Sequence, residues 1–138
     1  AIIQALLVRT GTEMLAIPIQ SVRENLRVTP EVVKTIHGER VITLRNEVLP
    51  ILDLTGLLGF GTITHDGGMP VIVVEAGTMK AGLMVDELLG QQEVVIKRLS
   101  PILGDVKGLA GATVLGDGTV ALILDVAAVL NDLTAESK

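Results

Sequence analysis

A unit of two apolar runs joined by a glycine turn lies near the end of the chain and limits what the chain can fold into. Residues 109–115 and 119–124 are largely apolar, and a Gly-Asp-Gly tripeptide joins them. Because glycine adopts positive φ at little steric cost, the tripeptide predicts a tight turn and the two runs predict a β-hairpin. Asp125 follows at the position of a helix N-cap, where its carboxylate would accept hydrogen bonds from free backbone N–H groups. The unit is therefore strand, turn, strand and capped helix.

The same unit occurs earlier in the chain. Residues 49–58 align with residues 121–130 at a shift of 72 positions, and Ile51, Leu52 and Asp53 then fall on identical residues. In this earlier hairpin an Arg-Asn pair takes the place of the glycine turn. Asparagine is among the non-glycine residues that adopt positive φ most readily, so a turn is predicted here as well.

A second correspondence lies upstream, at a shift of 66 positions. Gly11-Thr12 then falls on Gly77-Thr78, and both pairs lie between apolar runs. Matching features in the same order favour two copies of one small β unit. Each copy of about 65 residues would be marginally stable alone, so the two copies should share a core.

The composition favours an all-β fold and excludes several classes of function. Hydrophobic residues make up 49% of the chain and are almost entirely Val, Ile, Leu and Ala, of which Val and Ile favour strands. A net charge of −5 and a single aromatic residue argue against nucleic-acid binding, which needs clustered cations and stacking platforms. Cysteine is absent, which removes disulfides and thiolate chemistry. No apolar run approaches the ~18 residues of a membrane span, and no signal peptide is recognisable.

The chain is expected to form one domain over residues 1–138, built from short strands in two barrels. The barrels are predicted at roughly 8–60 and 69–126, with the terminal strand and helix able to cross over between them. The boundary is predicted at residues 60–68, which contain several glycines and polar residues. The first residue already belongs to an apolar run, which predicts a piece of a longer protein.

Residues that could bind a phosphate or a metal have simpler explanations. Gly56, Gly59 and Gly61 have a spacing that resembles a phosphate loop, but no Gly-Lys-Ser/Thr follows, so a helix end and a linker are favoured. His37 and His65 are the only histidines, and a metal site needs three or four ligands. We therefore expect no cofactor-binding or metal site.

Asp53 and Asp125 are related by the repeat and could be read as paired catalytic carboxylates. Helix capping explains both residues more simply. Gly116 and Gly118 are likewise assigned a structural role, as residues of the hairpin turn. No serine has a histidine placed near it as a base, so no catalytic site is expected.

Three segments resemble the CheW-like family. Leu44–Leu54, LRNEVLPILDL, resembles the family signature L-R-G-x-V-x-P-V-x-D-L, with Asn46 in place of the usual glycine. Residues 85–97, VDELLGQQEVVIK, resemble a second family segment in the version carried by chemotaxis histidine kinases. Residues 110–126 are also very similar to the kinase version. The resemblance covers roughly residues 5–130.

This resemblance implies a fold and a role. The fold is all-β, with two five-stranded SH3-like barrels packed around a shared apolar core and short helices. The role is that of the C-terminal regulatory domain of a chemotaxis sensor kinase, non-catalytic in itself but part of an ATP-dependent histidine kinase. The implied partners are the CheW-like coupling protein, the helical tips of chemoreceptors and the other kinase domains, in cytoplasmic receptor arrays at the inner face of the membrane. Neither nucleic acid nor direct membrane insertion is implied.

Two other interpretations remain open at this point. A free-standing coupling adaptor would have the same fold and the same mode of binding. A small-ligand or enzymatic β-barrel belongs to a different class, and no cluster of polar residues in the sequence favours it.

Five residues are candidates for protein binding by this resemblance. Leu6, Leu7 and Ile42 could supply an apolar patch for the coupling protein, although core positions are an equally good explanation. Arg45 lies at the tip of the first hairpin beside Asn46, where a guanidinium can pair with carboxylates or helix C-termini. Arg45 would then fix the register of a receptor helix held in a groove between the barrels. The alternative is an ordinary solvated turn arginine.

Overall fold

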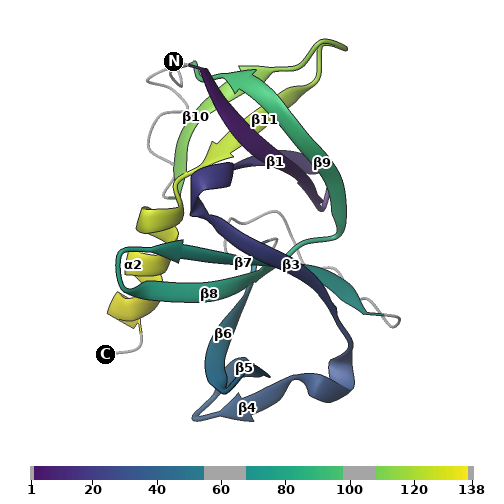
Figure 1. Cartoon of the computed structure of the whole chain (residues 1–138). Coiled ribbons are helices and arrows are strands. Elements are labelled where there is room, and N and C mark those ends of the chain that lie inside the picture. Colours follow the sequence, from purple (N-terminus) through teal and green to yellow (C-terminus); the bar gives the residue numbers. More distant parts are fainter. Residues whose placement is uncertain (1, 55–67, 98–107, 137–138) are drawn as a thin grey trace.

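The computed structural model describes residues 2–54, 68–97 and 108–136 (Figure 1). These residues form eleven strands, two 3-10 turns and one α-helix. The element bounds are β1 Ile2–Thr10, β2 Glu13–Pro18, η1 Ile19–Ser21, β3 Val22–Val28, η2 Pro30–Val32, β4 Lys34–Ile36, β5 Glu39–Leu44, β6 Glu47–Asp53, β7 Met69–Ala76, β8 Met79–Met84, β9 Glu87–Val95, β10 Leu109–Val114, β11 Val120–Leu124 and α2 Val126–Glu136.

The strands divide into two sheets, each curved into a barrel. Barrel 1 has the strand order β10-β11-β2-β1-β9, and barrel 2 has the order β3-β7-β8-β6-β5-β4. Figure 1 shows barrel 1 above barrel 2, with α2 packed beside both. The all-β class is confirmed. Barrel 2 has six strands rather than the expected five because the short strand β4 pairs along the outer edge of β5.

The strand registers show the internal repeat directly. In barrel 2, β6 pairs parallel with β8, and Ile51 lies opposite Gly82. In barrel 1, β11 pairs parallel with β2, and Ile123 lies opposite Ala16. These two pairs superimpose on each other under the shifts of 72 and 66 positions found in the sequence. The two barrels are therefore built from the same set of pairings.

The division of strands between the barrels differs from the predicted ranges 8–60 and 69–126. Each copy of the repeat gives its first hairpin to one barrel and its later strands to the other, so β1 and β2 pair with β9 and β11. Neither barrel is therefore a continuous stretch of chain. The predicted ranges do not correspond to the barrels, because sequence similarity locates the copies of the repeat and carries no information on which copy a strand pairs with.

The strands at the centre of the molecule are buried on both faces. In β1, Ala5 and Leu7 point into barrel 1, whereas Leu6 and Val8 point into the core that the two barrels share with α2. A strand covered on both sides needs apolar residues at every position, which explains the continuous apolar runs in the sequence. Barrel 2 has its own interior, formed by Val28, Ile42, Leu49, Ile51, Met69, Val71, Val73 and Met84.

Both predicted hairpin turns are present, with different lengths. Arg45 and Asn46 have φ values of 46° and 69°, the two positive values that a two-residue type I′ turn requires. The later turn is longer, with the Leu115 N–H bonded to the Thr119 carbonyl, and Gly118 has a φ of 87°. Asp117 accepts the Thr119 N–H at 2.9 Å, and this bond lowers the pKa of the Asp117 carboxyl. The positive φ at position 118 favours glycine there, because other residues adopt it only with strain.

Asp125 caps α2 as predicted. Its Oδ1 accepts the Ala128 N–H at 3.0 Å, a contact that contributes about 1 kcal/mol to helices of this kind. The helix predicted after Asp53 lies outside the described residues. At Thr29 the chain makes only a single 3-10 turn, without a side-chain cap. No helix in the described part of the chain is long and apolar enough to span a membrane.

Candidate docking surfaces

The three apolar residues for which a surface patch and core positions were equally good explanations are core residues in the structure. Leu6, Leu7 and Ile42 are each no more than 7% exposed. They also belong to three different clusters, which are the shared core, the interior of barrel 1 and the interior of barrel 2. Side chains buried at separate places cannot form one contact surface in the folded domain. The patch expected at these positions is therefore replaced by core packing.

Exposed aliphatic side chains gather instead on the outside of barrel 1. Ile2, Val95, Val114 and Val120 are between 46 and 64% exposed. Ile2 lies directly opposite Val95 on the neighbouring strand, and Val114 lies directly opposite Val120. We call these four residues the barrel 1 belt. β-Branched side chains in opposed pairs lose little entropy on contact, so they suit a protein interface.

Barrel 2 carries a corresponding set of exposed residues. Val48 is 58% exposed and stands 72 positions before Val120, so the two valines are equivalent in the repeat. Thr43 lies opposite Val48 on the neighbouring strand, just as Val114 lies opposite Val120. Val32, also exposed, precedes Lys34 by two positions. We call Val32, Thr43 and Val48 the barrel 2 belt.

Val32 and Val95 are not equivalent in the repeat, but each precedes by two positions a lysine that pairs with the first strand of a hairpin. Lys34 pairs with Val41, and Lys97 forms a bridge with Ala112. Sequence reasoning missed both belts. Val48 and Val120 lie in apolar runs, and such a run does not show which side chains face outward. Their equivalence at the repeat shift of 72 positions was the signal that could have found the belts.

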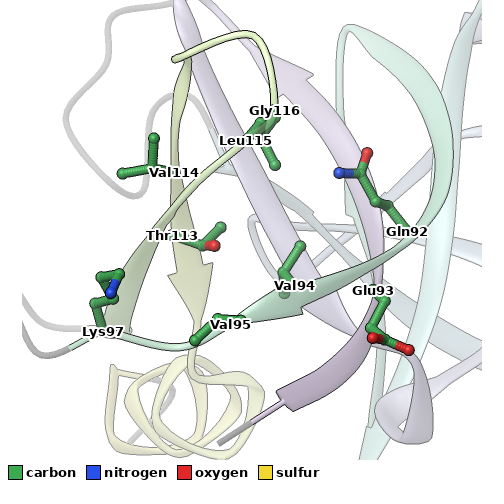
Figure 2. Close-up of a pocket in the computed structure, with 9 residues that line it drawn as sticks. All are labelled: Gln92, Glu93, Val94, Val95, Lys97, Thr113, Val114, Leu115 and Gly116. Carbon is green, nitrogen blue, oxygen red and sulfur yellow. The ribbon is translucent and has the colours of Figure 1, made fainter.

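A cleft of about 310 Å³ lies between β9 and β10 beside the barrel 1 belt. Figure 2 shows the two strands meeting near Lys97 and diverging toward Gln92 and Gly116. The closed end is fixed by two backbone hydrogen bonds between Lys97 and Ala112, at 2.7 and 2.9 Å. Val95 and Val114 line opposite walls.

A second hollow, of about 400 Å³, lies between the barrels. Leu26 and Pro70 contribute to it from barrel 2, and Leu88 contributes from barrel 1. Charged and polar side chains border these apolar residues, among them Arg27 and Glu87. This hollow lies between the barrels, where the family resemblance implied a groove, and we call it the inter-barrel groove.

Arg45 is exposed at the hairpin tip and is paired within the chain. Its guanidinium makes a two-point contact with the Glu24 carboxylate, through Nη1 to Oε1 at 3.2 Å and through Nη2 to Oε2. The hydrogen bond lowers the pKa of Glu24 and raises that of Arg45. Glu24 lies on β3 next to Asn25, which lines the inter-barrel groove. Asn46 is exposed beside Arg45 and holds the turn conformation.

The chain passes from barrel 2 to barrel 1 at Val85 and Asp86, where backbone bonds tie it to both barrels. Val85 donates to the Pro70 carbonyl of barrel 2 at 3.1 Å, and Asp86 donates to the Arg9 carbonyl of barrel 1 at 2.9 Å. The Asp86 carboxylate, only 1% exposed, accepts the Gly11 N–H and lies 3.8 Å from the Arg9 guanidinium. This arrangement fixes the crossing of the chain between the barrels.

The described residues contain no group of three or more His, Cys, Asp or Glu side chains that could hold a metal. His37 lies in an exposed turn with a φ of 51°. His65 and the glycines between residues 56 and 61 fall outside the described ranges. What the described part of the molecule offers is apolar surface, grooves and charged rims, which suit protein binding.

Comparison with known proteins agrees with this architecture. Residues 4–134 match the family described as CheW-like domain. The chain is 42% identical over 132 residues to a sensor histidine kinase CheAY of Helicobacter pylori, covering 95% of the chain and 16% of the kinase. It is 44% identical over 132 residues to a chemotaxis protein CheA of Treponema pallidum, and the match covers 94% of this chain and 16% of that protein. The chain thus spans about a sixth of the length of these relatives.

The fold also matches a solved structure. The crystal structure of the scaffolding protein TtCheW from Thermoanaerobacter tengcongensis superimposes with a TM-score of 0.72, at 19% sequence identity, over 91% of this chain and 85% of that one. At that identity the likeness concerns the fold. Together with the family match over nearly the whole length, it shows that this chain belongs to the CheW-like domain family.

Proposed function

We propose that this chain is the non-catalytic regulatory and scaffolding domain of a chemotaxis histidine kinase, and that it binds a CheW-like coupling protein. The observation that carries the proposal is the pair of exposed belts, one on each barrel, which contain the repeat-equivalent residues Val48 and Val120. Kinases dominate the relatives and are about six times longer than this chain, which favours the kinase domain over a free-standing adaptor.

Two related faces on one molecule have a consequence for assembly. Each barrel can dock a barrel of a CheW-like partner, because the partner domains share the same fold. The contacts are heterologous, since the two belts differ in sequence, and heterologous contacts close into rings or extend into arrays. This property suits a protein that works in cytoplasmic receptor arrays.

The inter-barrel groove is our candidate site for the helical tip of a chemoreceptor. Leu26, Pro70 and Leu88 provide an apolar floor, and charged residues border it. An amphipathic helix binds such a groove with its apolar face inward and its polar face at the rim. Arg45 pairs with Glu24 on β3, the strand that contributes Asn25, Leu26 and Arg27 to the groove.

Charge substitutions in the belts test the coupling proposal. Val48→Glu and Val120→Glu each place a carboxylate in an apolar contact, so each should weaken binding of the coupling protein by about tenfold or more. Binding is measured by calorimetry and folding by circular dichroism. Gln20→Glu adds the same charge at an exposed position outside both belts and should bind like the wild type. If neither belt variant weakens binding while both remain folded, the coupler binds elsewhere.

The pairing of Arg45 with Glu24 gives a separate prediction about pH. Because the pair lowers the pKa of Glu24, its stabilisation is present above the ordinary pKa of 4.5 and is lost as the pH falls through the folded-state value. Arg45→Ala should therefore lower the melting temperature slightly at neutral pH, and the difference should vanish in acid. The variant should also weaken co-sedimentation with receptors in reconstituted arrays. Wild-type co-sedimentation would limit Arg45 to its contact within the chain.

A further inference from the structure

The outer edge of β9 is unpaired in the described part of the molecule. β9 is the last strand of the barrel 1 sheet. Among the described residues, one bridge between Lys97 and Ala112 is the only pairing between the β9 end of the sheet and β10. Beyond this bridge the two strands separate and enclose the cleft of Figure 2. An exposed strand edge is a template on which another extended segment can pair.

The registers show which backbone groups face this cleft. In an antiparallel ladder, successive residues direct their N–H and C=O groups to opposite neighbours. Lys97 bonds to Ala112 across the cleft, so Val95 and Glu93, two and four residues earlier on β9, direct their groups the same way. On β10, Val114 likewise faces the cleft, two residues after Ala112.

The side chains around this edge define what could pair with it. Val94 and Thr113 are buried at the floor of the cleft, and Val95 and Val114 are exposed at its rim. The Glu93 carboxylate is exposed and accepts a hydrogen bond from the Gln4 side-chain amide at 3.2 Å. A partner strand would therefore need apolar side chains toward Val94 and a basic side chain beside Glu93.

We propose that the β9 edge of barrel 1 accepts an extended peptide segment as an added strand, with alternating aliphatic residues and a lysine or arginine opposite Glu93. The segment lies in the cleft and bonds to the backbone groups of Glu93 and Val95 that face it and have no ladder partner among the described residues. This mode of binding goes beyond the packing of side chains on the belts, because the backbone supplies the affinity and the side chains supply the selectivity.

A synthetic peptide tests the proposal. The probe is Thr-Val-Lys-Val-Thr-Val-Thr with blocked ends, in which the valines share one face and the lysine lies on the other. Titrated into isotope-labelled protein, it should shift the amide resonances of Glu93 and Val95 and slow the exchange of their hydrogens. The same peptide with N-methylated backbone amides should bind at least tenfold more weakly. Equal binding of both peptides, or no binding of either, would overturn the proposal.

Two substitutions at Val95 distinguish the contribution of its backbone N–H to peptide binding from that of its side chain. Val95→Pro removes an N–H that makes no ladder bond to another described strand, so the sheet should remain intact while peptide binding falls at least tenfold. Val95→Thr keeps the N–H and the β-branched shape and should bind within threefold of the wild type. Unchanged binding to a folded Val95→Pro protein would contradict strand addition.

A charge exchange provides a test that does not require proline to be tolerated. Glu93→Lys should weaken the lysine peptide severalfold, and a peptide with glutamate in place of lysine should recover that loss. Because this test requires no coupling protein, its failure leaves the proposed function standing. If both peptides bind the Glu93→Lys protein equally, the proposed register on β9 is wrong.

Discussion

Replacing Gly111 with alanine should destabilise the domain by about 3 kcal/mol, because overpacking and two lost backbone hydrogen bonds act together. A Cβ at this position would lie 2.6 Å from the Lys97 carbonyl oxygen and 3.1 Å from Cγ2 of Ile96. The nearest atom belongs to the backbone, so a rotamer change cannot relieve the contact. The strand must shift at the bridge between Lys97 and Ala112, which joins the two ends of the barrel 1 sheet.

Gly116 provides the matched control on the same hairpin. No atom lies within 4 Å of a Cβ built there, and its φ is not positive. Gly116→Ala should therefore stay within about 0.5 kcal/mol of the wild type. Urea unfolding followed by circular dichroism measures both variants. Equal midpoints for Gly111→Ala and Gly116→Ala would mean that the bridge does not hold barrel 1 closed.

Removing the Asp86 carboxylate should have an effect of similar size. Asp86→Ala leaves the Gly11 N–H without its acceptor and takes away the charge beside Arg9, which should lower the free energy of unfolding by about 2–3 kcal/mol. Asp86→Asn keeps an oxygen that can accept the Gly11 N–H and loses the charge alone. Because Arg9 remains partly exposed to solvent, Asp86→Asn should lower the free energy of unfolding by only about 1 kcal/mol.

The same urea titration distinguishes the two Asp86 variants. If Asp86→Ala unfolds at the wild-type midpoint, the contact does not hold the crossing between the barrels. If Asp86→Asn is as unstable as Asp86→Ala, the charge beside Arg9 matters more than the hydrogen bond to Gly11.

Local features of the fold could be predicted from the sequence, because they depend on nearby residues. The positive φ of Asn46, the cap at Asp125 and the glycine turn at Gly118 all follow from the conformational preferences of single side chains. The internal repeat could also be found, because its two copies share the same order of turns and apolar runs.

The exchange of strands between the barrels could not be predicted in the same way. Whether β9 pairs with β1 or with β7 is decided by contacts between residues far apart in the chain, and both strands are apolar. The same limit explains why the sequence left both a surface patch and core positions open for Leu6 and Leu7. In a strand with both faces buried, alternation gives no sign of which side chain points outward.

The central claim is that each barrel carries one docking surface for a CheW-like partner. Sedimentation of the chain with an excess of coupling protein measures the number of partners bound. Two partners are expected for the wild type, one for Val48→Glu or Val120→Glu alone, and none for the double variant, with all proteins folded. A single partner on the wild type, or a double variant that still binds two, would contradict the claim.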